Sequence, residues 1–197
     1  MIQRKLMYPS PILRSPSKTH SALSAERRNR NQALAGTENT ATLGDLLEAG
    51  SVHVGIVAEN KTDLLQQLVD SFRGCAGVTD LQAVADAVFE REAMLSTGVG
   101  YGIALPHAKT KAVSRTLAVF ATTSGPIDYD SFDQKPVRLV FMLIGPPNAS
   151  REHIRILGRI SRLLQREQIR ETLLEARTAA DIIDILHSAE DRIPTQE

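Results

Sequence analysis

Apolar and polar residues follow two distinct periods along this chain, and together they predict helices and strands in turn from about residue 42 onwards. Spacings of three and four between apolar residues are typical of amphipathic helices, and they recur in five segments: 61–73, 79–91, a helix that begins at about 151, 167–176 and 179–186. Runs of β-branched and other apolar residues predict buried strands at 51–58, 116–123 and 137–144. This alternation indicates an α/β domain in which a mixed β-sheet is flanked by helices.

Polar residues at the starts of three helical patterns predict N-caps, because their side-chain oxygens accept hydrogen bonds from free backbone amides. Thr42 is expected to begin a short helix that Gly50 ends. Asn60 is expected to cap the first long helix. Thr79 and Gln82 have the spacing of a capping box for the helix after it.

Two later segments carry expectations about burial. The helix that begins at about residue 151 is expected to bury one face, made of Ile154, Leu157, Ile160, Leu163 and Leu164. The segment between the last two strands is rich in turn-forming residues. It predicts a short hairpin or an edge strand around Ile127.

The N-terminal part of the sequence differs from the rest in composition. Residues 1–41 are rich in Ser, Arg, Asn and Pro, and the first 40 of them include seven basic and two acidic residues. A segment without a sustained apolar period buries too little surface to fold, so a disordered basic tail is expected here. The sequence therefore predicts one domain at 42–190, with a short C-terminal tail at 191–197.

The overall composition excludes several classes of function. The chain of 197 residues has 23 Lys and Arg against 23 Asp and Glu, which gives no indication of a nucleic-acid partner. Its single cysteine, Cys75, excludes an internal disulfide, leaves no cysteine pair for zinc and fits a reducing compartment. No apolar run approaches the roughly 20 residues of a membrane helix, and the N-terminus lacks the apolar core of a secretory signal. We therefore expect a cytoplasmic protein without membrane insertion, metal or cofactor.

A glycine-rich stretch that ends in a histidine is the strongest candidate for chemistry. Gly98, Gly100 and Gly102 alternate before a short apolar run, which Pro106 stops directly before His107. The third glycine comes one position too early for a dinucleotide fingerprint, and no P-loop lysine or hydrolase G-x-S-x-G follows. His107 has no close metal-ligand partner in sequence. What remains is a histidine that acts as a nucleophile toward phosphorus.

Such a nucleophile needs fixed donors for the phosphoryl oxygens, because positioning and electrostatic stabilisation supply most of this catalysis. The amides of Gly98, Gly100 and Gly102 are candidates, and Thr97 directly before them is assigned to the same phosphate-binding segment. Arg91, at the expected end of its helix, offers a cation. Closing the negative end of that helix explains Arg91 equally well.

Two other histidines lie within predicted elements. His153 falls in the first turn of its helix, one place before the apolar stripe, where a neutral, hydrogen-bonding ring is favoured. It faces either a pocket or, beside Arg151 and Glu152, the solvent. His53 lies inside an apolar strand and is interpreted as a packing residue.

The motif R-E-x-x-x-S-T-G-V-G-Y-G-I-A-L-P-H closely resembles the phosphorylation-site signature of the fructose, mannitol and nitrogen-regulatory type of phosphotransferase-system enzyme IIA. The resemblance continues through P-I-D-Y-D-S-F-D-Q-K-P-V-R-L-V-F-M-L-I-G-P and R-E-H-I-R-I-L-G-R-I-S-R-L-L, and covers about 42–190. It implies that His107 accepts a phosphoryl group from the phosphocarrier HPr or its nitrogen-branch counterpart. Arg91 and His153 match the family's supporting arginine and second histidine. The family's fold, a mixed sheet flanked by helices, agrees with the pattern of the sequence.

The resemblance implies two different uses of the phosphoryl group. In sugar transport the receiver is a cysteine of enzyme IIB, whereas in the nitrogen-regulatory members the phosphorylation state controls binding to target proteins. The sequence shows neither an enzyme IIB-like cysteine loop nor membrane-spanning enzyme IIC segments. A stand-alone IIA protein is therefore expected, which favours regulation over transport.

Overall fold

The fold is known from a computed structural model that describes residues 42–47 and 50–190. The described residues belong to one compact unit, 41–197. The predicted tails at 1–41 and 191–197 lie outside the described residues, so those two boundaries stay predictions. At the start of the domain, the Thr42 amide donates to Asp45 Oδ2 at 2.7 Å and the Asp45 amide to Thr42 Oγ1 at 3.1 Å. The cap predicted at Thr42 is thus present, over turns at 43–46, while part of the predicted helix lies outside the described residues.

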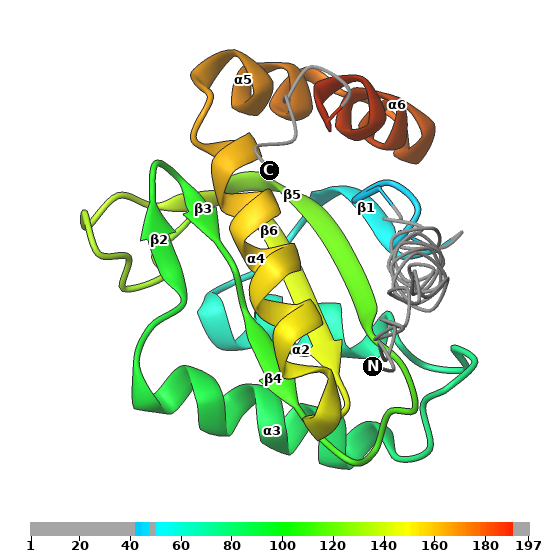
Figure 1. The fold of residues 1–197 in the computed structure, drawn as a ribbon. Coiled ribbons are helices and arrows are strands. Elements are labelled where there is room, and N and C mark those ends of the chain that lie inside the picture. The colour runs from blue at the N-terminus through cyan, green and yellow to red at the C-terminus, as the bar shows by residue number, and fades with distance from the viewer. Residues whose placement is uncertain (1–41, 48–49, 191–197) are drawn as a thin grey trace, which may run out of the picture. The chain divides into compact units, whose positions relative to one another are not determined.

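One mixed sheet of six strands forms the centre of the domain, which confirms the predicted fold class (Figure 1). The strands in the order of the sheet are β1 (Val52–Ile56), β5 (Leu117–Ile127), β6 (Val137–Gly145), β3 (Ile103–Ala104) and β2 (Gly98–Gly100), with β4 (His107–Lys109) also paired to β6. Parallel pairs are β1–β5, β3–β6 and β4–β6, and antiparallel pairs are β5–β6 and β2–β3.

Two short strands share one side of β6. β3 pairs with Leu139 and Val140, and β4 pairs further along with residues 143–145. Between these strands the chain passes through buried Pro106, whose carbonyl accepts from the Leu143 amide at 2.9 Å. Because proline has no amide hydrogen to donate, the ladder is interrupted there and resumes at His107.

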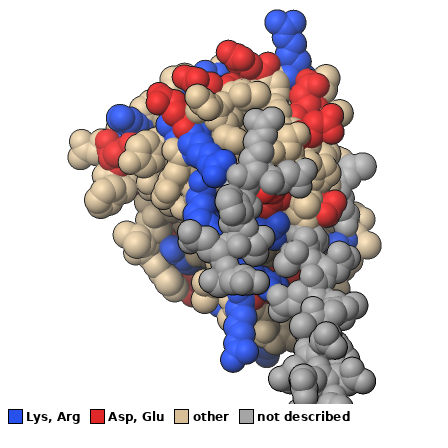
Figure 2. Space-filling view, turned by 45° about the horizontal axis from the view of Figure 1, so that its top comes forward, with Lys and Arg blue, Asp and Glu red and all other residues tan. Residues whose placement is uncertain are grey.

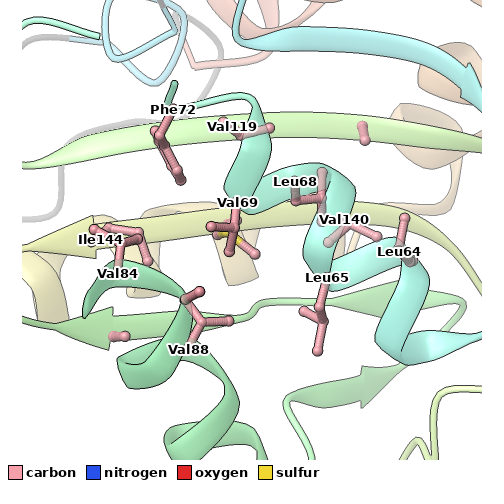
Figure 3. Close-up of a cluster of buried hydrophobic side chains, with 14 of the residues drawn as sticks. Leu64, Leu65, Leu68, Val69, Phe72, Val84, Val88, Val119, Val140 and Ile144 are labelled. Atoms are coloured by element: carbon pink, nitrogen blue, oxygen red, sulfur yellow. The ribbon is translucent and has the colours of Figure 1, made fainter. Parts of the chain in front are cut away.

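Helices cover both faces of the sheet, and two separate apolar clusters fill the spaces between them. Helices α2 (Lys61–Asp70) and α3 (Leu81–Met94) cover one face, over the cluster drawn in Figure 3. The other face is covered by α4 (Ser150–Leu164), which follows a short 3-10 turn η1 (Pro147–Ala149), and by α5 (Glu167–Glu175) and α6 (Ala179–Glu190). Neighbours along β5 alternate between the clusters, since successive strand side chains point to opposite faces.

The predicted helix caps are correct at one site and displaced at another. Asn60 caps α2 as expected, with its Oδ1 accepting from the Asp63 amide at 3.0 Å. The N-cap of α3 is Asp80, whose Oδ1 accepts from the Ala83 amide at 3.1 Å, so the prediction of Thr79 is wrong by one residue. The reason is that the Thr79 amide and hydroxyl both donate to the carbonyl of Ala112.

Three further expectations differ from the structure. Helix α3 continues to Met94, one turn beyond the predicted end. The strand β1 forms where expected, but it is an edge strand and only Val52 in it is buried. The segment around Ile127 is the end of β5, joined to Val137 after an irregularity in register, and is not a separate hairpin. Burial and strand order depend on neighbours distant in sequence, which local patterns do not specify.

Candidate functional site

His107 is the first residue of β4, placed there by the Pro106 break in the ladder. Its side chain is half-buried, and Nδ1 lies 2.9 Å from the backbone carbonyl of Leu105. A carbonyl oxygen only accepts hydrogen bonds, so Nδ1 carries the hydrogen in this contact. In the neutral ring, Nε2 therefore keeps its lone pair and is the nitrogen that can act as a nucleophile.

The surroundings of His107 keep its ring neutral. Burial lowers the pKa of His107 below its ordinary value of 6.5, and the nearby positive charges of Arg91 and Lys109 lower it further. The hydrogen bond to Leu105 and the charge of Glu92 act in the opposite direction without reversing the shift. At neutral pH the lone pair on Nε2 is consequently available.

His107 opens into a cavity of about 350 Å³ at the free side of β4. The cavity lies between β4 and the last two turns of α3, and its lining residues are Ala87, Glu90, Arg91, Met94, His107, Ala108 and Lys109. Two larger cavities, of about 410 and 550 Å³, have no histidine among their lining residues. The predicted nucleophile and the predicted arginine thus share one cavity.

Arg91 closes its helix, as one of the two interpretations predicted, and the other role, a cation for phosphate, stays a prediction. It lies in the last turn of α3, and its Nη1 donates to the Leu95 carbonyl at 2.8 Å, where the helix ends. It also lines the cavity beside His107. Lys109 is a second cation in this cavity, and the sequence pattern did not single it out. Its position two residues after His107 in a strand places both side chains on the same face. Lys109 Nζ donates to Ser150 Oγ at 2.9 Å.

His153 is buried, with 1% of its surface exposed, and belongs to the buried stripe of α4 that continues through Ile156 and Ile160. The predicted face of this helix was therefore wrong at its start, where Ile154 is 71% exposed. His153 Nε2 donates to the Leu143 carbonyl at 3.3 Å. Its Nδ1 is buried without a hydrogen-bond partner among the described residues.

His107 and His153 are both linked to Leu143 of β6. Leu143 is the register partner of His107, and its carbonyl accepts from His153. The His153 ring lies against Gly145, where a Cβ would come within 2.6 Å of the ring Cε1. Burial lowers the pKa of His153, and a charge on His107 lowers it further. Arg91 and His107 thus share one cavity, whereas His153 does not line it and is linked to His107 through Leu143.

The glycine run has a different position. Gly98 and Gly100 form β2, which pairs with β3 as a hairpin, and its tip passes through Tyr101 and Gly102 with positive φ values of 56° and 75°. None of these residues lines the cavity around His107. The phosphate-binding role of Gly98, Gly100 and Gly102 stays a prediction, and their visible role is to shape the hairpin that leads to His107.

Thr97 is buried, and both its amide and its hydroxyl are hydrogen-bonded to Glu92. Its amide donates to Glu92 Oε1 at 3.0 Å and its hydroxyl to Glu92 Oε2. Glu92 is a buried carboxylate in the last turns of α3 and pairs with Lys61 at 2.8 Å. The sequence pattern predicted no role for Glu92, although it stands beside Arg91 in the motif. Phosphate binding by Thr97 also stays a prediction.

Helix α4 and the residues directly after it carry many basic side chains. This helix and the residue after the following turn supply five arginines: Arg151, Arg155, Arg159, Arg162 and Arg166. Figure 2 shows Lys and Arg in a column down the middle of the face in view, with Asp and Glu mainly near its upper edge. Positive charge near the start of α4, which Lys109 contacts, favours the approach of an anionic group.

The described residues lack two features that other functions require. Within 42–47 and 50–190, no three His, Cys, Asp or Glu side chains are grouped so as to hold a metal ion. No helix in that part of the chain has the length and apolar character needed to span a bilayer.

The chain was compared with known protein families and with curated proteins. The model of the phosphoenolpyruvate-dependent sugar phosphotransferase system EIIA 2 family matches residues 45–189. A fructose-specific EIIA component of Haloferax volcanii is 41% identical over 126 residues, which are 64% of this chain and 82% of that protein. A nitrogen regulatory protein of Bradyrhizobium diazoefficiens is 34% identical over 142 residues, 72% of this chain and 92% of that protein.

Solved structures show the same fold. The nitrogen regulatory protein IIA-Ntr of Neisseria meningitidis has a TM-score of 0.69 at 29% identity, over 73% of this chain and 98% of that chain. The IIA mannitol protein of Escherichia coli, solved in complex with phosphorylated enzyme IIB, has a TM-score of 0.62 at 21% identity, over 72% and 97% of the two chains.

Proposed function

Because this chain belongs to the phosphoenolpyruvate-dependent sugar phosphotransferase system EIIA 2 family, we propose that His107 is its phosphorylation site. In this proposal His107 accepts a phosphoryl group from the phosphocarrier HPr or its nitrogen-branch counterpart and passes it on. The observation that carries the proposal is the Nδ1–H contact with Leu105, which leaves Nε2 unprotonated in a cavity that also contains Arg91 and Lys109.

The transfer forms one bond and breaks another. The lone pair of His107 Nε2 attacks phosphorus, and the bond between phosphorus and the donor atom breaks, with its electron pair leaving on the donor. Nδ1 keeps its hydrogen and its bond to the Leu105 carbonyl, so the imidazolium charge that develops on attack is stabilised by that acceptor. In the second step the phosphorus–nitrogen bond breaks, and its electron pair returns to Nε2.

Arg91 and His153 support the phosphoryl group in this proposal. The guanidinium of Arg91 neutralises charge on the phosphoryl oxygens, which become more negative as the transfer proceeds. His153 has a buried Nδ1 without a partner among the described residues. A phosphoryl group nearby favours protonation of that nitrogen, because an opposite charge stabilises the imidazolium form. His153 then donates a hydrogen bond at the site only when phosphate is present.

We propose that the phosphorylation state of His107 serves as a regulatory signal. The similarity to nitrogen regulatory proteins over 92% of one such protein supports this use. A phosphoryl group adds negative charge beside Arg91 and Lys109 and thereby changes the affinity of a protein that docks around the cavity. The alternative use is donation to a separate enzyme IIB of the fructose or mannitol type, which the 41% identity to a fructose-specific component supports.

One assay tests the shared step. The protein is mixed with radiolabelled phosphoenolpyruvate, enzyme I and HPr, and an acid-labile, base-stable protein adduct is expected. His107→Ala should remove the adduct. Label that persists in His107→Ala would reject His107 as the phosphorylation site.

A second assay separates the two uses. Purified phosphorylated protein is offered enzyme IIB proteins of the fructose and mannitol types. Rapid and reversible loss of label to an enzyme IIB supports transport. Retention of label with every enzyme IIB, together with a target protein whose affinity differs between the two phosphorylation states, supports regulation.

A further inference from the structure

Glu92 is unusual because its carboxylate is buried beside the site yet does not face the cavity. Only 8% of its surface is exposed, and it is absent from the lining of the His107 cavity. A buried carboxylate is costly unless it is paired and hydrogen-bonded. Here Lys61 Nζ lies 2.8 Å from Oε1, while the Thr97 amide and hydroxyl donate to its two oxygens.

Lys61 is itself held on several sides. Its Nζ lies 4.7 Å from the centre of the Tyr129 ring and donates to Ser96 Oγ at 3.3 Å. The Tyr129 hydroxyl lies 3.3 Å from Thr97 Oγ1. The Glu92 carboxylate therefore occupies a position fixed from α2, from α3 and from the segment before β2.

A continuous series of hydrogen bonds leads from this carboxylate to His107. Glu92 holds Thr97 by two bonds, and the Thr97 carbonyl accepts from the Leu105 amide at 3.0 Å. The Leu105 carbonyl in turn accepts from His107 Nδ1 at 2.9 Å. Each bond holds one backbone group of a residue whose other backbone group makes the next bond, so we expect the direction of the Leu105 carbonyl to depend on Thr97 and hence on Glu92.

We propose that Glu92, anchored by Lys61, is a positioning residue that selects the Nδ1–H tautomer of His107 through Thr97 and Leu105. Glu92 touches neither the cavity nor the reacting nitrogen, so it positions the ring through the backbone, while its charge acts separately on the pKa of His107. The inference rests on the proposed function of His107, because tautomer selection has its value in leaving Nε2 free to attack phosphorus. It adds a second residue of the same helical turn to the site, since Arg91 of α3 lines the cavity while its neighbour Glu92 fixes the ring.

The alternative is that this network only stabilises the junction of α2 and α3 with the sheet. A purely structural role changes the melting temperature when Glu92 is replaced, but leaves the His107 tautomer as it is. A positioning role changes the tautomer itself. The nitrogen chemical shifts of the His107 ring report the tautomer directly in the unphosphorylated protein.

The experiment compares Glu92→Gln with Asp86→Asn in the full-length protein. Asp86 is an exposed acidic residue on α3 and is outside the cavity lining, so its variant removes the same charge from the same helix. Two-bond proton–nitrogen spectra of labelled protein are expected to show mainly Nδ1–H in the wild type and in Asp86→Asn. Glu92→Gln should show a mixture with Nε2–H, and phosphorylation by phospho-HPr should slow roughly tenfold.

Two variants of Thr97 and one of Lys61 complete the test. Thr97→Val loses the hydroxyl bond to Glu92 and is expected to shift the tautomer in the same direction, whereas Thr97→Ser keeps that hydroxyl and the wild-type spectrum. If Glu92→Gln does not fold, Thr97→Val and Lys61→Gln decide the question from the same spectra. A wild-type tautomer and rate in Glu92→Gln and Thr97→Val would overturn the inference.

The result is separable from the proposed function. The tautomer is measured without phosphate, donor or partner, so it tests the positioning chain alone. A tautomer shift in Glu92→Gln together with wild-type protein that takes no label would support the chain and reject the phosphotransfer assignment. Normal labelling of the wild type with an unchanged tautomer in Glu92→Gln would do the reverse.

Discussion

Two strands of the sheet, β1 and β4, carry one histidine each. Comparing them shows which surroundings distinguish a candidate nucleophile from a packing histidine. His53 lies on β1 and His107 on β4; each strand is short and pairs in parallel with a single longer strand. Burial lowers the pKa of both histidines. Their burial and secondary structure are therefore alike, so these features do not distinguish them.

The difference lies in the groups around each ring. For His53, burial alone shifts the pKa, and Nε2 has no hydrogen-bond partner within the described part of the chain. For His107, a carbonyl fixes the tautomer, two cations share the cavity, and a second histidine approaches through Leu143. Fixed partners and nearby charges, rather than burial, therefore distinguish His107 from His53.

Replacing each histidine in turn should give the largest difference between the two strands. His107→Ala is expected to lower the rate of phosphorylation by phospho-HPr more than about a thousandfold, because the nucleophile is lost. His53→Ala is expected to keep the wild-type rate. Initial rates of label incorporation measure both, and a comparable loss in His53→Ala would show that the β1 edge takes part in the chemistry.

The cations at the β4 edge give the next largest effect. Arg91→Gln is expected to slow phosphorylation about a hundredfold, as for loss of one preorganised donor to a developing charge. It should also raise the pKa of His107, since the charge of Arg91 lowers it. Rate measurements and a titration of the His107 ring signals check both results. Arg177→Gln, which removes an exposed arginine after α5, is the matched control and should change neither.

The second histidine can be displaced without replacing it. Gly145→Ala places a Cβ 2.6 Å from His153 Cε1, so the ring or the strand must move. Crowding of this kind costs about 1–3 kcal/mol of unfolding free energy. Gly158→Ala on α4 is the control, because nothing lies within 4 Å of its added Cβ, and it should stabilise by roughly 0.5–1 kcal/mol. Denaturant unfolding measures both, and equal stabilities would contradict the close packing of His153.

The smallest expected effect concerns the lowered pKa that the histidines of β1 and β4 have in common. The folded-state pKa values of His53, His107 and His153 are all lowered from 6.5, so the unfolded chain binds more protons in the window below that pH. Their contribution to stability is present above pH 6.5 and is lost as the pH falls through the folded-state values. His53→Asn should reduce the slope of the unfolding free energy against pH between about pH 5 and 6.5. The reduction should correspond to at most one bound proton. An unchanged slope would show that His53 is solvated.

The sequence predicted the parts of the fold that depend on local chemistry. The Asn60 cap requires one side chain and one nearby amide, and it was found correctly. Thr79 has an equally suitable hydroxyl, but the partner that diverts it, Ala112, is 33 residues away. The exposure of β1 likewise depends on the order of the strands.

The same limit applies to the site. His107 was predicted as the nucleophile because its glycines, proline and histidine are contiguous, whereas the burial of Glu92 depends on Lys61, which is 31 positions earlier in the chain. A helical glutamate normally indicates a solvated face, and the partner that keeps this one buried is supplied only by the tertiary fold. His153 was placed outside the stripe because Ile154 and Leu157 offered a more apolar face.

The adjacency of Arg91 and Glu92 restricts how this sequence can change. Successive residues of a helix are separated by about 100° of rotation, so one side chain is directed to the cavity and the next to the interior. A one-residue deletion in α3 upstream of Arg91 would bring Glu92 to the cavity position that Arg91 now holds, and a one-residue insertion would bring Arg91 to the buried position that Glu92 now holds. A substitution at Arg91 or Glu92 alters one of the two positions, whereas a change of length upstream of Arg91 alters both at once.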